Sequence, residues 1–400
     1  MPFESAPAPF PFRSSPTPLD LPPDYARLRR RAPASRVRLP TGDTAWLVTS
    51  HAGVRGVLTD PLLSRAAAVR PRGPRCNAVV HEPTTLGAMD PPEHTRLRRL
   101  VAPAFTARRI ERLRPGVERL VRRRVDAIVH SGPPADLVAE LAQPLPITVI
   151  CELLGVPEGD RAAFHAWAEV FLSAGGHPPH EVHAARARFQ RYFAELIAAR
   201  RARDGDDLLR ALAAAHSDED RLSQAELVNL CVSLLVNGFA TTTTQIVNSL
   251  VALFRHPDEL ARLRADPGLV PLAVEELLRF VPHRSDGGAV RVATGTVELC
   301  GVEIPAGDGV IPAVSAANHD PDVFPAPDRL DVGRARNPHL TFGHGIHHCL
   351  GVHLARLELT TVLDALVRRL PRLRLAVAEH ELRWHTDTLL PSPVHLPVTW

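Results

Sequence analysis

Apolar positions along this 400-residue chain recur mostly at helical spacing, and alternating, strand-like runs are short. Residues 96–128, interrupted near Pro115, and residues 184–203 alternate apolar residues with arginine at the period of an amphipathic helix. The strand-like runs are residues 37–48, which a turn near Gly42 breaks, residues 290–304 and the tail at residues 382–398. The pattern predicts a mainly α fold with a small β region.

The longest helical stretch, residues 223–256, begins with a Ser-x-x-Glu capping box at Ser223 and Glu226 and ends before a proline. It is apolar on nearly all faces, so we expect it to be buried. A membrane span has a similar composition, but Asn237 and the threonines at residues 241–244 interrupt the apolar run. The stretch is therefore predicted to be the central helix of a soluble core.

The organisation of the chain favours one domain over several. No fixed-period repeat and no long Gly/Ser-rich or charged linker divides it, so we expect a single domain over residues 1–400. Two irregular stretches, residues 64–88 and residues 173–180, are rich in glycine and proline. Because long loops of this kind are often functional, both are candidate walls of a pocket.

Composition narrows the possible partners and the cellular location. The net charge is only +3 although the chain has 47 basic residues, all of them arginine, which argues against binding to nucleic acid or to a membrane surface. Residues 1–23 are rich in proline and lack a basic start followed by an apolar run. We therefore expect neither a secretory leader nor a membrane anchor, and predict a cytoplasmic protein.

The five cysteines stand singly, without the paired spacing of a zinc site or the density of a disulfide scaffold. Cys349 has the most informative neighbours, because residues 342–351 read Phe-Gly-His-Gly-Ile-His-His-Cys-Leu-Gly and precede an amphipathic helix at residues 352–370. The glycines allow close approach of a large flat ligand and leave amide donors for the sulfur. A lone cysteine is ordinarily a small buried apolar residue, but this setting favours a thiolate that binds a metal.

This segment resembles the haem-binding signature of the cytochrome P450 family, Phe-Gly-x-Gly-x-His-x-Cys-x-Gly, with Leu-Ala-Arg following at residues 354–356. The resemblance implies the cytochrome P450 fold, in which a long central helix lies over a buried haem b (iron protoporphyrin IX). It also implies that Cys349 is the metal ligand and that Phe342 and Gly351 contribute to cofactor binding.

Two further segments extend the resemblance. Glu276 and Arg279 match the family's Glu-x-x-Arg, whose ion pair braces the haem-binding core together with residues 328–337. Taken alone, these two residues could be a surface pair worth only ~0.3 kcal/mol. His94 and Arg98 lie four residues apart, so they share one helix face and can meet one carboxylate.

The resemblance assigns that second pair to a haem propionate. By the same resemblance, Arg291 and His347 are expected to reach the propionates as well. A lone histidine is more often a satisfied core residue, so His94 is informative only together with Arg98.

On the distal side, the family's central helix has Ala/Gly-Gly-x-Asp/Glu-Thr, and residues 237–241 here read Asn-Gly-Phe-Ala-Thr. Gly238 and Thr241 fit that pattern, whereas Ala240 stands in the place of the acid. The three are the candidate catalytic positions, with Thr241 expected to stabilise iron-bound oxygen. Without a carboxylate, protons could come through water ordered by Asn237 or through polar groups of the substrate. The other possibility is that the chemistry is slower or specialised. A neutral difference, with water standing in, is equally open.

The resemblance also marks candidate substrate contacts, which are mostly apolar and suggest a hydrophobic pocket. They are Asn237, Phe239, Ala289, Val290 and Leu389. Asn237 could instead face a helix kink, and Phe239 could be plain core. Polar residues in the same region, His283, Arg284 and Asp286, either orient substrate groups or face solvent.

A cluster of arginines near the proposed propionate pair suggests how electrons arrive. Its members are Arg96, Arg99, Arg108, Arg109, Arg112 and Arg356. In the family this face receives an acidic iron–sulfur protein, although charged runs are usually solvated faces. Because no flavin or nicotinamide fingerprint is visible, ferredoxin and ferredoxin reductase are the expected electron donors.

The predicted activity is reductive activation of dioxygen to hydroxylate or epoxidise an apolar natural product. Oxidative carbon–carbon or carbon–nitrogen coupling of an aromatic peptide, such as a tryptophan-containing diketopiperazine, is the alternative within the enzyme class. A haem sensor or carrier without turnover is the alternative of another class, and a peroxide-driven enzyme is a further one.

Overall fold

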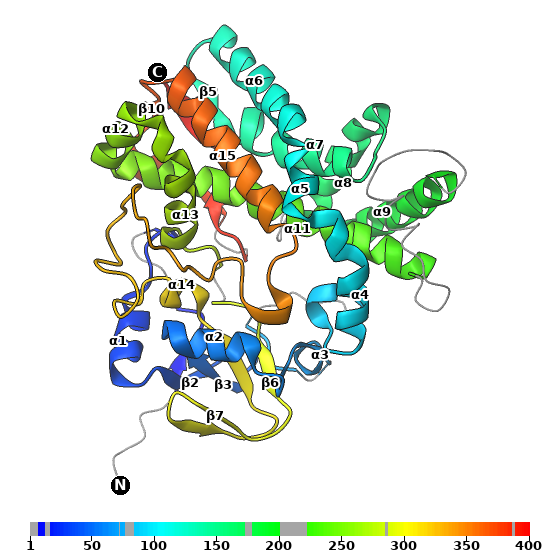
Figure 1. The fold of residues 1–400 in the computed structure, drawn as a ribbon, viewed down its shortest axis with the longest axis vertical. Coiled ribbons are helices and arrows are strands. Elements are labelled where there is room, and N and C mark those ends of the chain that lie inside the picture. The colour runs from blue at the N-terminus through cyan, green and yellow to red at the C-terminus, as the bar shows by residue number, and fades with distance from the viewer. Residues whose placement is uncertain are drawn as a thin grey trace. The chain divides into compact units, whose positions relative to one another are not determined.

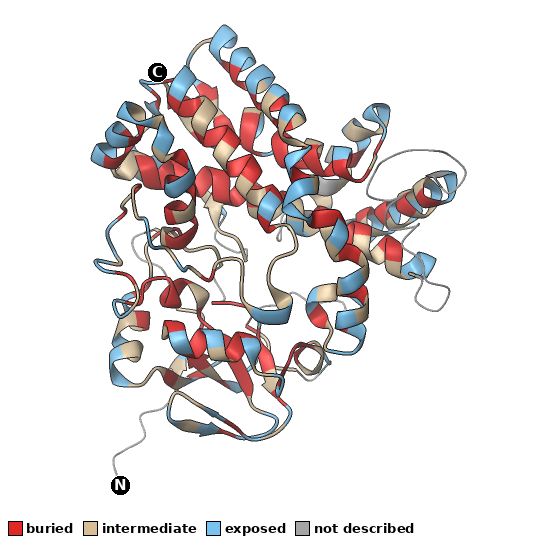
Figure 2. Cartoon of the chain, viewed as in Figure 1, coloured by how far each residue is buried: buried red, intermediate tan, exposed pale blue. Residues whose placement is uncertain are grey.

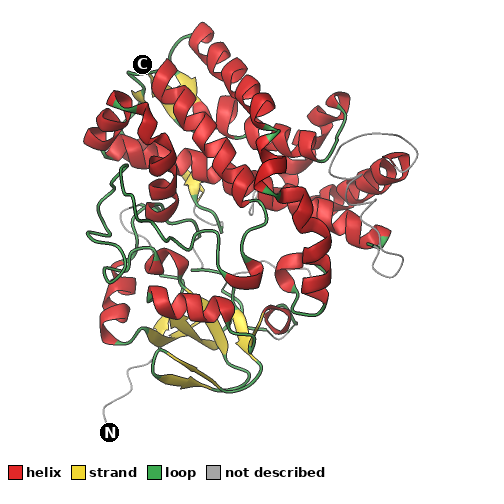
Figure 3. Cartoon of the chain, in the orientation of Figure 1, coloured by secondary structure: helices red, strands yellow, loops and turns green. Residues whose placement is uncertain are grey.

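The computed structural model divides into two compact units, each assembled from separated stretches of the chain. Unit 1 comprises Met1–Glu93 and Glu275–Cys349, and unit 2 comprises His94–Val274 and Leu350–Trp400. Strands gather mainly in unit 1, and helices make up most of unit 2 (Figure 3). The structure describes residues 7–12, 17–71, 73–76, 84–172, 178–200, 222–284, 287–385 and 389–400.

Unit 1 is built on a six-stranded sheet with the order β1-β2-β3-β9-β6-β4 (Figure 1). The strands of the unit are β1 (Ala8–Pro9), β2 (Ala34–Arg38), β3 (Thr44–Val48), β4 (Leu63–Ser64), β6 (Arg291–Ala293), β7 (Val297–Leu299), β8 (Val302–Ile304) and β9 (Gly309–Pro312). The predicted break at Gly42 is confirmed, because β2 and β3 form an antiparallel pair around it with Gly42 at φ +90°. The run at residues 290–304 contains β6 and a β7–β8 hairpin that turns at Cys300 and Gly301.

Short helices cover this sheet. They are α1 (Pro23–Arg31), α2 (His51–Thr59), α3 (Arg65–Ala68), α14 (Val314–Ala317), η1 (Leu86–Ala88) and η6 (Gly345–His347). Helix α2 begins at an N-cap serine, Ser50, whose hydroxyl accepts from the amide of Gly53. It packs against β9, α14 and η6, and its buried valines belong to the apolar cluster of the sheet. Figure 2 shows buried and exposed positions alternating along the helix. The sheet and α2 thus support the segment that carries Cys349.

Unit 2 is mainly helical. Its helices are α4 (Glu93–Val101), α5 (Ala107–Glu111), α6 (Arg114–Ser131), α7 (Pro144–Leu153), α8 (Arg161–Leu172), α9 (Pro179–Arg200), α11 (Gln224–Arg255), α12 (Pro257–Ala265) and α15 (Val352–Arg369). Helix α13 (Val270–Phe280) begins in unit 2 and has its last turns in unit 1. Shorter elements are η2 (Ala102–Phe105), η3 (Val138–Ala142), η4 (Glu158–Asp160), η5 (Pro267–Leu269), η7 (Glu379–Glu381), β5 (Ala135–Asp136), β10 (Arg374–Leu375), β11 (Trp384–His385), β12 (Ser392–Pro393) and β13 (Pro397–Thr399).

The predicted central helix is α11, and its capping box is present, with Ser223 and Glu226 each bonding the other's backbone amide. It packs against α7, α9 and α15, and most of its second half is buried. Among the described residues, α11 is the one helix long and apolar enough to cross a membrane, a property that the core helix of a soluble protein shares. The packing agrees with the prediction of a core helix.

The predicted helix at residues 96–128 is divided differently from the expectation. The chain leaves α4 at Val101, passes through η2 and α5, and enters α6 at Arg114. The predicted interruption near Pro115 is confirmed, because α5 ends at Glu111 and α6 begins at Arg114. Pro115 lies in the first turn of α6, where its missing amide hydrogen costs no helical bond. The earlier break between α4 and α5, through η2, was not predicted. Helix α9 begins at Pro179, five residues before the predicted start, and residues 201–203 lie outside the described part of the chain.

Candidate active site

The segment that contains Cys349 folds back on itself within unit 1. The amide of Cys349 donates to the carbonyl of Phe342 at 2.8 Å, and the amide of Gly343 donates to Leu340 at 2.8 Å. Gly345 has φ +70°, and a Cβ there would lie 2.7 Å from the carbonyl oxygen of Leu58 at the end of α2. Only glycine fits this position, so the segment is held close against α2 and Cys349 is left half-buried.

Gly351 has no comparable reason within the chain to be glycine. Its φ is −84°, and no atom of the described chain lies within 4 Å of the position that its Cβ would take. It also stands at the N-cap of α15, two residues after Cys349. This is open space beside the cysteine, as a flat ligand bound to the sulfur requires.

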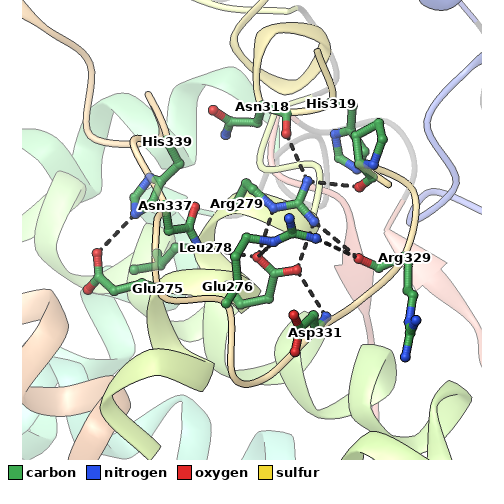
Figure 4. Close-up of polar contacts among 12 residues, drawn as sticks. Glu275, Glu276, Leu278, Arg279, Asn318, His319, Arg329, Asp331, Asn337 and His339 are labelled. Carbon is green, nitrogen blue, oxygen red and sulfur yellow. Dashed lines mark hydrogen bonds and ion pairs between the residues drawn. The ribbon is translucent and has the colours of Figure 1, made fainter. Parts of the chain in front are cut away.

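A polar clamp ties the segment before Phe342 to α13 (Figure 4). The ring of His339 accepts from the amide of Thr341 at Nδ1, 3.3 Å, so in the neutral ring Nε2 carries the proton and donates to Glu275 Oε2 at 3.1 Å. The Thr341 hydroxyl donates to the carbonyl of Leu278 at 2.6 Å and accepts from Asn318 at 2.9 Å. No sequence pattern singled out this clamp.

The Glu-x-x-Arg pair is fully buried and forms the centre of a larger network, as predicted. Arg279 donates from Nε and Nη2 to the two carboxylate oxygens of Glu276, both at 2.8 Å, and both side chains have 0% exposure. The same carboxylate accepts from Arg334 at 2.9 Å, from Asn337 at 3.1 Å and from the amide of Asp331 at 3.0 Å. Glu276 therefore fixes the irregular segment at residues 328–337, and the surface-pair alternative is excluded.

Arg291 supplies a buried cation in unit 1. It lies on β6 with 4% exposure, and Nη1 donates to the carbonyl of Leu63 at 3.2 Å. Its Nε has no hydrogen-bond partner among the described residues. Burial lowers the pKa of Arg291 to about 10, and the carboxylate of Asp90 opposes that shift. A buried guanidinium with an unused donor is suited to an anionic group such as a propionate. His347, in η6, is half-buried in the same unit.

His94 and Arg98 lie one turn apart on α4 in unit 2. His94 is almost fully buried, at 2% exposure, and Arg98 is half-buried. The spacing places both on one face of the helix, as predicted. Their neighbour Arg96 instead forms an ion pair with Glu226 in the first turn of α11. Arg96 was expected in the arginine cluster, but this pairing neutralises much of its charge.

Two polar side chains in the middle of α11, Thr241 and Asn237, bond to groups on the same helix. The hydroxyl of Thr241 donates to the carbonyl of Asn237, one turn earlier. The amide of Asn237, which is exposed, donates to the carbonyl and hydroxyl of Ser233 at 2.8 and 3.2 Å. The helix continues without a break through this stretch, and Gly238 packs on Ile150 of α7, where an added Cβ would lie at 3.4 Å.

The remaining predicted site residues have varied surroundings. Phe239 is buried, at 8% exposure, and Ala240 is half-buried. Ala289 is exposed, whereas the side chain of Val290 belongs to a core cluster of unit 1. Leu389 lies in unit 2 before β12, and Asn248 of α11 donates to the carbonyl of Pro391 in the same turn at 2.8 Å. Asp286, residues 77–83 and residues 173–177 lie outside the described residues.

Comparison with known proteins identifies the family. The model of the family described as Cytochrome P450 matches residues 268–381. Nocardicin C N-oxygenase from Nocardia uniformis subsp. tsuyamanensis is 47% identical over 98% of each chain. The chain belongs to the cytochrome P450 family. Mycinamicin IV hydroxylase/epoxidase from Micromonospora griseorubida is 45% identical over 94% of each chain, and the solved structure of the mixed-function P450 MycG has a TM-score of 0.94 at 45% identity, covering 98% of this chain and 100% of that one.

The protein is thus a cytochrome P450 monooxygenase with the mainly helical P450 fold and small sheets. Membership implies a haem-thiolate cofactor, and the residues present fit it. The open space at Gly351, the unused Nε of Arg291 and the half-buried Cys349 are each accounted for by such a group.

Proposed function

We propose that this P450 hydroxylates or epoxidises an apolar natural product at a haem b held by Cys349. The observation that carries the proposal is the Cys349 segment, where a hydrogen bond to Phe342 and two positive-φ glycines present the sulfur beside open space. His94, Arg98, Arg291 and His347 are proposed to bind the propionates, with Phe342 and Gly351 next to the ring. When bound, the haem would supply reductive activation of dioxygen, which a thiolate ligand favours.

The residues of α11 are proposed to manage protons. Thr241 can turn its hydroxyl from the Asn237 carbonyl and so hold a proton at Oγ1 where the reaction needs it. Ala240 has no group that titrates, so the proton must reach Thr241 through water or through the substrate. An added Cβ at Gly238 would make only an ordinary contact with Ile150 of α7, so Gly238 is kept as a proposed catalytic position for its match to the family pattern and not for its packing.

The substrate class is proposed from the relatives. Their printed names describe actions on nocardicin C and mycinamicin IV, and another relative, 42% identical, is named pentalenic acid synthase. We propose an apolar natural product bounded by Asn237, Phe239, Ala289, Val290 and Leu389. We also propose that the protein works in the cytoplasm as one domain over residues 1–400, with electrons from a ferredoxin and its reductase. The interleaving of the two units along the chain supports a single domain.

Oxidative coupling is the second candidate. A relative named biflaviolin synthase is 39% identical over 94% of this chain. The missing acid at Ala240 does not choose between coupling and oxygen insertion. Product mass separates the two, because insertion adds one oxygen atom and coupling removes hydrogen atoms.

The test is the difference spectrum of the reduced protein with carbon monoxide. We expect a red-shifted Soret band typical of a thiolate ligand in the wild type and in Cys300→Ser, the matched control for a half-buried cysteine in the same unit. Cys349→Ser should lose that band while keeping its fold. A histidine-type band in haem-loaded wild type would refute Cys349 as the ligand.

A further inference from the structure

Arg65 is a buried arginine in unit 1 that the site described above does not use. It follows β4 directly, has 6% exposure, and donates from Nε to the carbonyl of Gly87 at 3.0 Å and from Nη1 to the carbonyl of Val290. The two carbonyls belong to segments that are far apart in the sequence. One lies in η1, within residues 64–88, and the other immediately precedes β6.

The backbone of Arg65 is itself fixed by one carboxylate. Asp90 accepts from the Ser64 hydroxyl, from the amide of Arg65 at 2.9 Å and from the amide of Ala66 at 3.3 Å. Asp90 therefore anchors the first turn of α3, so the side chain of Arg65 extends from a fixed backbone. A planar guanidinium with fixed donor directions can hold two acceptors at a set separation, which an ammonium group does less well.

Arg65 and Arg291 form a reciprocal pair across two strands. Strands β4 and β6 are antiparallel, with Ser64 opposite Val292. Arg291 donates to the carbonyl of Leu63 on β4, whereas Arg65 donates to the carbonyl of Val290 just before β6. Each side chain thus binds the backbone of the other's strand, and the carboxylate of Asp90 offsets the positive charge, raising the pKa of Arg291 against the effect of burial.

We propose that Arg65 is a positioning residue for substrate specificity, holding the η1 segment and the Ala289–Val290 segment at a fixed separation while keeping Arg291 in place. The proposal rests on the proposed function, in which Ala289 and Val290 border the substrate and Arg291 binds a propionate. In this proposal Arg65 acts through Val290 and Arg291, and not by its own contact with the substrate or the haem. Replacing Arg65 should change the selectivity of the pocket among ligands more than it changes the affinity for haem.

The experiment compares Arg65→Lys with wild type and with Arg55→Lys, an exposed arginine on α2 of the same unit. In haem-loaded protein, backbone amides of residues 84–90 and 287–292 should exchange with deuterium about tenfold faster in Arg65→Lys. The reason is that one ammonium group cannot hold the carbonyls of Gly87 and Val290 together as the guanidinium does. Two haem-iron ligands of different size report on the pocket. Binding of 4-phenylimidazole should weaken about fivefold to tenfold, whereas binding of imidazole should change less than about twofold.

Unchanged exchange in both segments, or equal weakening of the two azoles, would overturn the proposal. Arg55→Lys should behave as wild type in each measurement, and the same losses in that variant would also overturn it. Amide exchange does not depend on haem ligation. A wild type without the thiolate-type carbon monoxide band would therefore refute the proposed function, while the exchange rates would still decide whether Arg65 holds the two segments.

Discussion

The Glu276 network in unit 1 and the middle turns of α11 in unit 2 differ in burial and in where their polar side chains find partners. Glu276 and Arg279 are fully buried, whereas Asn237 is exposed and Thr241 is half-buried. Glu276 gathers donors from Arg279, Arg334 and Asn337, so that distant parts of the chain are fixed by one carboxylate. In α11, Thr241 and Asn237 bond only to groups one turn earlier on their own helix. The first region is therefore a rigid frame, whereas the second leaves its side chains ready to exchange partners.

Replacement of Glu276 by glutamine is expected to have the largest effect. The variant keeps the shape of the side chain but removes the charge that compensates a fully buried guanidinium, Arg279. Breaking such a buried pair costs about 3–5 kcal/mol of unfolding free energy. Urea unfolding of the haem-loaded protein measures it, with Glu303→Gln, an exposed glutamate on β8, as the control expected to change by less than about 0.5 kcal/mol. A loss as small as that of the control would show that the network does not frame the unit.

A second buried carboxyl, Glu358 on α15, sharpens the contrast because it lacks such donors. It has 2% exposure, its Oε2 has no partner among the described residues, and burial raises its pKa to about 8 from 4.5. The folded protein therefore holds a proton that the unfolded chain has released between these pH values. Its contribution to stability is complete below about pH 4.5 and falls by roughly 1.4 kcal/mol per pH unit up to about pH 8.

Glu358→Gln should remove that slope, because glutamine resembles the protonated acid. The unfolding free energy of the variant minus that of wild type should rise from pH 5.5 to pH 7.5. This subtraction cancels the pH-dependent contribution of His319 to stability, which is the same in both proteins. Burial lowers the pKa of His319 to about 4, so its contribution is lost as pH falls from 6.5 toward 4. A difference independent of pH would contradict a protonated Glu358.

The sequence predicted the parts of the molecule in which a residue type has one geometric role. Cys349 with its glycines, Glu276 with Arg279, and the capping box of α11 could be identified because each pattern is local or belongs to a family motif. Contacts between distant segments could not. Nothing near Arg65 in the sequence points to Val290, 225 residues away, since a guanidinium that binds a backbone carbonyl leaves no trace in the partner's residue type.

Proline likewise marked the helix break before α6, because it favours the first turn of a helix, whereas the earlier break between α4 and α5 was not predicted. The clamp of His339 on Glu275 was missed because both residues are common in polar surface positions. The role of Ala240 is a different case. It depends on water and on the substrate, which neither a motif nor a neighbouring side chain specifies.

The smallest expected effect belongs to that position, in a variant that gives α11 the acid it lacks. Ala240 is half-buried next to Thr241, so Ala240→Asp should disturb stability little and supply a group that titrates one residue from the hydroxyl. If proton delivery limits the wild type, product formed per electron pair consumed should rise about twofold to tenfold. Ala240→Asn is the matched control, equal in size and unable to deliver a proton from a carboxyl group. An equal rise in both variants would mean that side-chain size, not the proton, changed the outcome, and unchanged or lower coupling in Ala240→Asp would show that water or the substrate already supplies the protons.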